Sequence, residues 1–160
     1  MKRFVKIVAF ILSLILLCGC AKSDGAEVAD TNGDGKLTCT LEIRCDTLLE
    51  NPDVVPAEKA DLVPGNGILL PVREVEFTGG NSVFDVFRQI LREEKIHFEY
   101  VDASAYDSVY IEGIGNLYEF DCGPQSGWMY CVNGTYPGLG CSGYTLNLGA
   151  DVGAEKNYEE

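Results

Sequence analysis

The sequence predicts an α+β fold: a β-grasp-like mixed sheet, one amphipathic helix packed across it, and a C-terminal hairpin. Two segments with strand periodicity come first, one segment with helix periodicity follows, and several short strand-like segments complete the order. A single helix with one apolar stripe has to bury that stripe against a sheet. Of the 160 residues, 46% are hydrophobic, which is enough for one packed core.

The first expected strand, Leu37 to Asp46, alternates strictly between apolar and polar residues. This period of two places one face on the core and the other in water. The inward positions are Leu37, Cys39, Leu41, Ile43 and Cys45. A connection rich in proline follows, with a short helical turn at Pro56 to Asp61, before alternation returns at Val72 to Phe77.

The expected helix begins where Ser82 and Asp85 approximate a capping box. Its apolar stripe consists of Val83, Phe84, Phe87, Ile90 and Leu91. The charged residues of the same segment fall on the other face, so we interpret the helix as core and surface only. Further strands are expected at residues 97–101, 109–114, 117–120, 128–132 and 144–148, and a frayed acidic tail at 149–160.

The stretch from Asp121 to Cys141 is the richest in functional signals, and it holds the only tryptophan. Its strand is followed at once by Asn133-Gly134, the strongest short hairpin signal, because both residues tolerate positive φ. A loop-rich rim is therefore expected, with Trp128, Tyr130, Asn133 and Tyr136 as candidate ligand-binding residues. Strand alternation is equally consistent with Trp128 and Tyr130 as plain core residues.

Residues 1–20 have the form of an export signal. Basic residues precede the apolar run Ile7 to Leu17, which is long enough for a signal peptide and too short to span a bilayer. The run ends in Leu17-Cys18-Gly19-Cys20, which resembles the bacterial lipoprotein box, with Cys20 as the lipidated residue. An ordinary secretory peptide cleaved nearby is the alternative. In both cases the chain is exported, to the outer face of the cell membrane or the extracellular space, where disulfides persist.

Residues 21–36 are small, polar and glycine-rich, and are expected to form a flexible tether. Asp30 to Leu37 resembles the start of a calcium loop of the EF-hand or dockerin kind, with Gly35 at the sharp bend. The twelfth position should supply a bidentate carboxylate, but Leu41 occupies it. We therefore interpret the segment as a linker and predict no metal site.

The formal net charge of −13 argues against nucleic acid as a partner, because phosphate contacts need clustered Lys and Arg. It also means that attachment to anionic lipid would depend on a covalent anchor. His97 is the only histidine and is expected on the surface beside Glu99, so no Ser-His-Asp set or zinc site is indicated. No phosphate loop or dinucleotide fingerprint is present. The sequence predicts a protein that is not an enzyme and requires no cofactor.

Five cysteines follow the leader: Cys39, Cys45, Cys122, Cys131 and Cys141. In an exported chain they are disulfide candidates first. Cys39 and Cys45 share a face of one extended strand and are too far apart to bond to each other, so each needs a partner elsewhere. We expect Cys122 to pair with Cys141 across the rim, because loops on both sides allow them to meet. Since five is odd, one thiol stays free or links to a second chain.

Two blocks resemble a known family: Ser82-Val83-Phe84-Asp85 at the helix start, and GWMYCVNG at residues 127–134. Within TGGNSVFDVFRQI (78–90) and YIEGIGNLYEFDCGPQSGWMYCVNG (110–134), they resemble the bacterial domain of unknown function grouped with the C-terminal domain of transcobalamin. The resemblance runs from about Cys39 to Cys141 and implies a β-grasp-like fold at the cell surface. In transcobalamin and intrinsic factor, the corresponding domain covers one face of cobalamin, opposite a helical barrel.

The sequence departs from that family in two respects. No segment matches the helical barrel, so at most half of such a pocket is expected. The family continues through a Gly-Asp turn into a last strand that carries another Cys. Tyr144 to Gly149 can be aligned either with the strand before that turn or with the last strand. If it is the last strand, a stretch is missing and Leu146 stands where the Cys would be.

Two functions follow from these observations. The first is a cell-surface lipoprotein that binds a small ligand, with cobalamin or another corrinoid as the candidate, since a corrin ring suits an aromatic rim. The second is a surface module that uses the same aromatic residues to bind a protein or a glycan. The expected division is a signal peptide at 1–20, a tether at 21–36, a transcobalamin-C-terminal-like domain at 37–148 and an acidic tail at 149–160.

Overall fold

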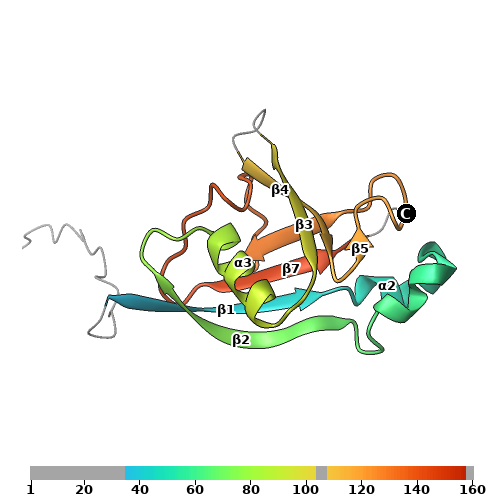
Figure 1. Cartoon of the computed structure of the whole chain (residues 1–160), viewed down its shortest axis with the longest axis horizontal. Coiled ribbons are helices and arrows are strands. Elements are labelled where there is room, and N and C mark those ends of the chain that lie inside the picture. Colours follow the sequence, from blue (N-terminus) through green and yellow to red (C-terminus); the bar gives the residue numbers. More distant parts are fainter. Residues whose placement is uncertain (1–34, 104–107, 158–160) are drawn as a thin grey trace, which may run out of the picture.

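Two β-sheets and one long helix form the fold in the computed structural model, which describes residues 35–103 and 108–157 (Figure 1). The four-stranded sheet has the order β2-β1-β7-β6, with β1 at Lys36–Arg44, β2 at Ile68–Thr78, β6 at Trp128–Val132 and β7 at Asp151–Lys156. The three-stranded sheet has the order β3-β4-β5, with β3 at Phe98–Ala103, β4 at Ser108–Ile114 and β5 at Leu117–Tyr118. The predicted α+β class is confirmed. The expected leader and most of the tether lie outside the described residues.

Strand β1 has the alternation that its sequence predicts, with Cys39, Leu41 and Ile43 almost completely buried. It pairs antiparallel with β2 on one side and parallel with β7 on the other, so it lies in the interior of the sheet. The short helix α2 (Thr47–Glu50) and the 3-10 turns η1 (Pro52–Val54) and η2 (Ala57–Leu62) then lead to β2. The helical turn expected at Pro56 to Asp61 is thus confirmed as η2.

Helix α3, Val83–Glu93, begins at the predicted capping box. The Asp85 backbone N–H donates to Ser82 Oγ at 3.2 Å, and the Ser82 backbone N–H donates to Asp85 Oδ2 at 2.9 Å. The reciprocal bonds satisfy two donors that a helix start would otherwise leave without partners. Its buried stripe packs into the main core, while Phe84 meets Tyr100 of β3 edge-to-face at 4.9 Å between ring centroids.

The position of the last strand differs from the prediction. Tyr144–Leu148 forms no strand and has one isolated bridge, between Ser82 and Thr145. Asp151–Lys156 instead forms β7, in the interior of the four-stranded sheet between β1 and β6. The expectation of a frayed tail is therefore wrong for these residues. Val152, Ala154 and Lys156 alternate inward, but a small residue and a lysine give no hydrophobic signal in the sequence.

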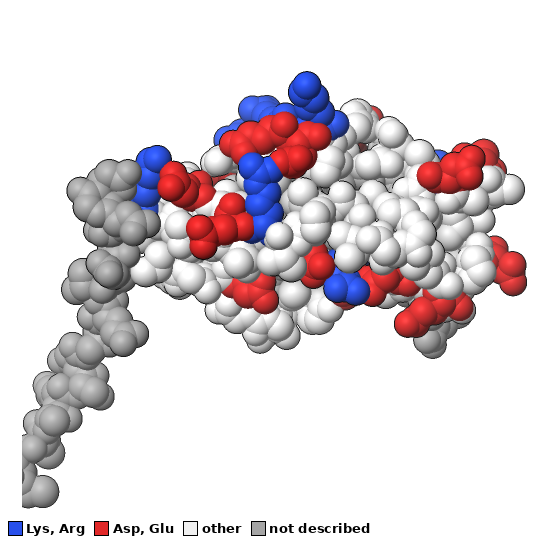
Figure 2. All heavy atoms as spheres, turned by 90° about the horizontal axis from the view of Figure 1, so that it is seen from below, with Lys and Arg blue, Asp and Glu red and all other residues white. Residues whose placement is uncertain are grey.

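Charged side chains on the underside of the molecule lie in several small groups, some of both signs and some acidic only, and no continuous basic patch covers that face (Figure 2). Ion pairs such as Lys36 with Glu76, at 2.8 Å, bring opposite charges together across β1 and β2. This mixed pattern agrees with the acidic composition and offers no footprint for a nucleic acid on that face. No helix among the described residues is long and apolar enough to cross a membrane.

Candidate functional site

The turn after β6 has the backbone that the sequence predicts. Asn133 and Gly134 both have positive φ, at 51° and 71°. Such a turn matches the twist of paired strands. The returning segment, however, makes only the bridge between Val132 and Thr135, and the long partner of β6 is β7. Asn133 Oδ1 accepts a 2.8 Å hydrogen bond from the Asp151 backbone N–H, so its side chain fixes the start of β7.

A cavity of about 180 Å³ lies where the two sheets and α3 meet. Its walls come from α3, β4, β6, β7 and the loop before Cys141. The lining residues are Val83, Phe87, Val109, Tyr110, Ile111, Ile114, Trp128, Met129, Tyr130, Gly140, Cys141, Val152 and Ala154. Tyr110 and Met129 are also exposed at the surface, so they mark the mouth.

The lining contains no charged side chain, and its polar side-chain groups are bonded within the protein. Trp128 Nε1–H donates to the Leu117 carbonyl oxygen at 2.8 Å, and the Tyr130 hydroxyl donates to the Leu139 carbonyl oxygen at 2.5 Å. The Tyr110 hydroxyl donates to Glu119, and the Cys141 thiol donates to the Val109 carbonyl oxygen at 3.8 Å. A ligand therefore finds aromatic and aliphatic surface here, and no side-chain donor that lacks a partner.

The titratable groups of the lining stay neutral near pH 7. Burial raises the pKa of Tyr130 to about 12, and burial together with the hydrogen bond to Glu119 raises the pKa of Tyr110 to about 12. Burial also raises the pKa of the Cys141 thiol to about 11. A charged form would lose its hydration in this apolar setting without gaining a counter-ion. The cavity thus favours uncharged, apolar groups.

The structure brings together two of the four candidate ligand-binding residues. Trp128 and Tyr130 both line the cavity, and both pack against the main core at the same time. Tyr136 lies on the exposed loop after the turn, 54% accessible, with its hydroxyl donating to Glu155. Asn133 holds the turn. These two residues are therefore outside the cavity, and their role in binding stays a prediction.

Sequence reasoning missed the wall that faces β6. Val109 and Ile111 of β4 come from the other sheet, and Gly140 comes from the loop over the cavity. An added Cβ at Gly140 would lie 1.5 Å from Ser108 Oγ, so only glycine lets this loop approach β4 so closely. The alternation of residues 109–114 predicted a strand, but nothing in that pattern told which side chains it would face.

All five cysteines of the described residues are free thiols in this structure. Cys122 and Cys141, the expected pair, fall in different hydrophobic clusters. Cys141 and Cys39 belong to the main core, whereas Cys122 shares a small second cluster with Cys45. The structure therefore does not group the cysteines as the sequence suggested.

His97 lies on the surface as expected, within 3.0 Å of Glu99 and 3.3 Å of the Tyr118 hydroxyl. Hydrogen bonds from Tyr118 and His97 lower the pKa of Glu99. No group of three or more His, Cys, Asp or Glu side chains suited to a metal occurs in residues 35–103 and 108–157. Most of the calcium-loop-like segment lies outside those ranges.

Comparison with known proteins supports the family resemblance in part. Residues 80–153 match the family model described as "Domain of unknown function (DUF4430)". That range holds the whole of α3, β4 and β6, and thus most of the cavity wall. No curated protein matches the sequence.

A solved structure shows a similar fold. The chain is similar to part of haptocorrin, crystallised in complex with Cbi, with a TM-score of 0.57 and 12% sequence identity over 78% of this chain. It spans about a quarter of that protein, 26% of its length. A second similar structure, from Ruminococcus gnavus, is a protein named as a candidate metal-binding protein; the TM-score is 0.44 and the identity 11%, over 78% of this chain and 99% of that one. The fold is therefore one that haptocorrin also contains.

Proposed function

We propose that this domain is a binding module that takes an uncharged apolar group of a small molecule into the cavity between β4 and β6. One observation carries the proposal: a 180 Å³ space is lined by aromatic and aliphatic side chains, without a charge. An engineered apolar cavity of about 150 Å³ stays dry and binds benzene, so a space of this size suits one or two fused rings. Polar or charged groups would lose hydration without compensation.

A corrinoid is the more specific ligand that we propose. The support is the fold shared with haptocorrin, whose crystal structure holds Cbi. A corrin ring is far wider than this cavity, so only a peripheral group could enter while the ring lay across the mouth at Tyr110 and Met129. Both residues are about two-fifths exposed and offer flat or pliable apolar surface. No catalytic step is required of the protein in this function.

The cellular setting is part of the same proposal. The leader and Cys20 support a lipid-anchored protein on the outer face of the cell membrane, with the domain held away from the bilayer by the tether. A binding module in that place would capture its ligand outside the cell. Globomycin-sensitive processing and labelling of the chain with a radioactive fatty acid would test the anchor, and loss of both in Cys20→Ser is the expected result.

A second function is favoured by the loop after the turn. Tyr136 and Leu139 are 54% and 60% exposed, and both lie outside the cavity lining. Exposed aromatic and aliphatic side chains on one loop suit a protein or glycan partner. Tyr136→Ala separates the two functions, because it should weaken such a partner and leave a ligand in the cavity unaffected.

The test is a titration of the full chain with four probes: cobalamin, cobinamide, indole and benzoate. Heat is followed by calorimetry for all four probes. Fluorescence of Trp128, the only tryptophan, is a second readout for the probes other than indole, since indole itself fluoresces as tryptophan does. We expect indole to bind with a dissociation constant of about 0.1–1 mM, as its size permits, and benzoate not to bind. A corrinoid that uses the cavity as well as the mouth should bind at micromolar affinity or better.

A cavity-filling variant identifies the site. Ala154→Leu places a larger side chain into the lining from β7, where Ala154 is 7% exposed. We expect it to weaken indole binding at least tenfold, while the matched variant Ala57→Leu, at an exposed position, leaves binding unchanged. Absence of heat and of fluorescence change for every probe would refute the binding module. Indole binding without corrinoid binding would refute the corrinoid alone.

A further inference from the structure

Two cysteines that are far apart in the sequence meet in a second, smaller hydrophobic cluster. This cluster consists of Cys45, Leu48, Leu117 and Cys122. Cys45 is 0% exposed and Cys122 is 2% exposed. Cys45 follows β1 of the four-stranded sheet, whereas Cys122 follows β5 of the three-stranded sheet. The two thiols are thus the only cysteines that share this cluster in the described part of the chain.

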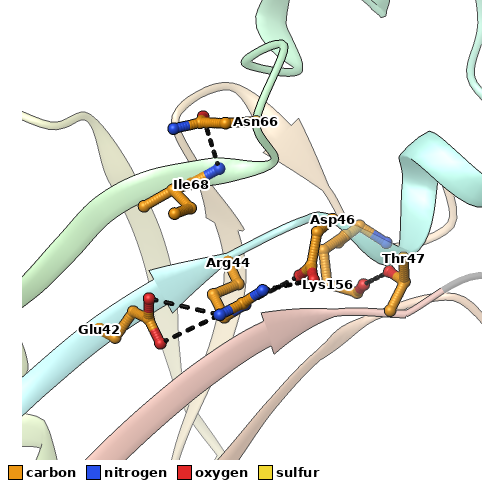
Figure 3. A network of polar contacts seen from close by, with 7 residues as sticks. All are labelled: Glu42, Arg44, Asp46, Thr47, Asn66, Ile68 and Lys156. Carbon is orange, nitrogen blue, oxygen red and sulfur yellow. Dashed lines mark hydrogen bonds and ion pairs between the residues drawn. The ribbon is translucent and has the colours of Figure 1, made fainter.

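The backbone at Cys45 is firmly held. Its N–H donates to the Gly67 carbonyl oxygen at 2.7 Å, and the side chains on either side of it, Arg44 and Asp46, form an ion pair of 2.6 Å. Figure 3 shows this pair at the end of β1, next to the hydrogen bond from Thr47 to the Lys156 carbonyl oxygen. The Cys45 backbone is therefore fixed at a position where its side chain is completely buried in the small cluster.

The backbone at Cys122 is held as well. Its N–H donates to Ser126 Oγ at 3.0 Å, and Ser126 is itself buried. The preceding residue, Asp121, accepts from the Tyr118 backbone N–H and from Lys59, both at 2.6 Å. A buried cysteine whose backbone is held on both sides loses little further backbone freedom when it forms a cross-link, so the entropic cost of bonding in the folded state is low.

The shared cluster places the two thiols in one apolar setting, and the surroundings of Cys45 include Cys122. Burial raises the pKa of Cys45 to about 11, and the nearby Asp46 and Cys122 add to the rise. The other thiols have different surroundings. Cys39 and Cys141 lie in the main core, and Cys131 lies on β6 with its sulfur 2.9 Å from where a Cβ on Gly153 would stand.

We propose that Cys45 and Cys122 form a disulfide that locks the end of β1 to the loop after β5. Each thiol loses a proton, the pair loses two electrons, and one S–S bond replaces two S–H bonds. A disulfide oxidant such as oxidised glutathione accepts the electrons and leaves as two thiols. The bond joins the two sheets behind Trp128, which packs against both clusters. This pairing replaces the Cys122–Cys141 bond that the sequence suggested.

The test uses the full chain, equilibrated with oxidised and reduced glutathione, then alkylated under denaturing conditions and mapped by mass spectrometry. We expect a linked pair of peptides that contain Cys45 and Cys122, with Cys39, Cys131 and Cys141 alkylated. Reduction should lower the thermal midpoint by on the order of 10 °C, because the bond closes a long loop in the unfolded chain. Linkage of Cys122 to Cys141, or alkylation of both Cys45 and Cys122, would overturn the proposal.

Variants separate the bond from the packing of the thiols. Cys45→Ser and Cys122→Ser should each remove the sensitivity of the midpoint to reductant, and the double variant should lower the midpoint no further than one of them. Cys131→Ser is the matched control and should keep the full response to reductant. If the midpoint of Cys45→Ser still fell on reduction, the bond would belong to another pair of cysteines. If a variant fails to fold, the peptide map of the unmodified chain still shows which cysteines are linked.

Discussion

The Trp128 indole N–H donates a 2.8 Å hydrogen bond to the Leu117 carbonyl oxygen, and this bond joins β6 of one sheet to β5 of the other. The same indole ring packs against the main core and the small cluster, and it forms part of the cavity wall. Trp128 therefore has a structural and a ligand-facing role at once. Its substitution has to be interpreted with stability measured alongside binding.

Trp128→Phe should cost about 1–2 kcal/mol of the free energy of unfolding, because a smaller aromatic ring remains while the hydrogen bond to the buried Leu117 is lost. Trp128→Ala should cost about 3 kcal/mol, because packing against both clusters is lost as well. Urea denaturation followed by circular dichroism measures both values. Tyr136→Ala, at an exposed position, should change stability by less than about 0.5 kcal/mol. Equal losses for the Phe and Ala variants would show that ring packing contributes little.

The capping box makes helix α3 sensitive to acid. The hydrogen bonds from Ser82 to the Asp85 carboxylate lower the pKa of Asp85 below its ordinary value of 3.8. A carboxyl with a lowered pKa in the folded state stabilises the fold above the unfolded pKa, and the contribution is lost as the pH falls through the folded pKa. The thermal midpoint of Asp85→Asn should therefore lie below that of the unmodified chain above about pH 5, with the gap closing towards about pH 2.

Two further variants accompany Asp85→Asn: Ser82→Ala tests the other half of the capping box, and Asp61→Asn is the control. Ser82→Ala removes one half of the box and should lower stability by about 1 kcal/mol near neutral pH. Asp61→Asn changes an exposed carboxylate outside α3 and should leave the pH profile of the midpoint unaltered. If the difference in thermal midpoint between Asp85→Asn and the unmodified chain stayed constant from pH 7 to pH 2, the ionised Asp85 carboxylate would not be the source of the stabilisation.

Strand β1 and helix α3 could be predicted from the sequence because each has a complete local signal. The strict alternation of Cys39, Leu41 and Ile43 and the apolar stripe of α3 each specify a buried face without reference to the rest of the chain. Strand β7 could not be predicted in this way. Its inward positions include Ala154 and Lys156, so its place in the sheet depends on pairing with β1 and β6, which are distant in the sequence.

The candidate site was predictable only on one side. Trp128 and Tyr130 stand next to the Asn-Gly turn, and that signal places aromatic residues near a loop-rich rim. The opposite wall depends on β4 crossing over β6 from a separate sheet, and Val109 and Ile111 have the pattern of any half-buried strand. Tertiary packing decides which face of β4 lies against β6, and the alternation of apolar and polar residues in the sequence does not encode this choice.

The ion pair between Lys59 and Asp121 should stabilise the fold measurably. Lys59 Nζ lies 2.6 Å from Asp121 Oδ2 and 4.8 Å from the centre of the Tyr118 ring, and the two charged side chains are 24% and 15% exposed. A double-mutant cycle with Lys59→Met and Asp121→Asn should give a coupling energy of about 1–2 kcal/mol. The pair joins η2 to the loop after β5.

The exposed pair of Lys36 and Glu76 provides the control for that cycle. Its side chains are 52% and 59% exposed, so solvent screens the attraction. The same type of cycle should give less than about 0.5 kcal/mol there. Urea denaturation at low and at about 1 M salt checks both, since only the exposed pair should lose its coupling fully in salt. Equal coupling at the two sites would show that burial has no effect on the Lys59 pair.

Lys156 should be a source of instability near neutral pH. Its side chain is completely buried, and its Nζ donates to the Asn157 carbonyl oxygen at 3.1 Å. Loss of hydration lowers the pKa of Lys156 below its ordinary value of 10.5, and the acidic Asp121 and Glu119 offset only part of this effect. Lys156→Met, which keeps the length of the side chain and removes the charge, should raise the free energy of unfolding by about 1–2 kcal/mol at pH 7.

The gain from Lys156→Met should shrink as the pH rises. Below the lowered pKa of Lys156, the folded and unfolded chains both carry the proton, so the folded state bears the whole cost of a buried charge. Between that pKa and 10.5 the folded chain releases the proton first, and the unmodified protein recovers stability relative to the variant. Urea denaturation at pH 7 and at about pH 10 measures the difference, with Lys95→Met at an exposed position as the control. A Lys156→Met variant that is less stable at both pH values would show that contacts of the ammonium group outweigh its loss of hydration.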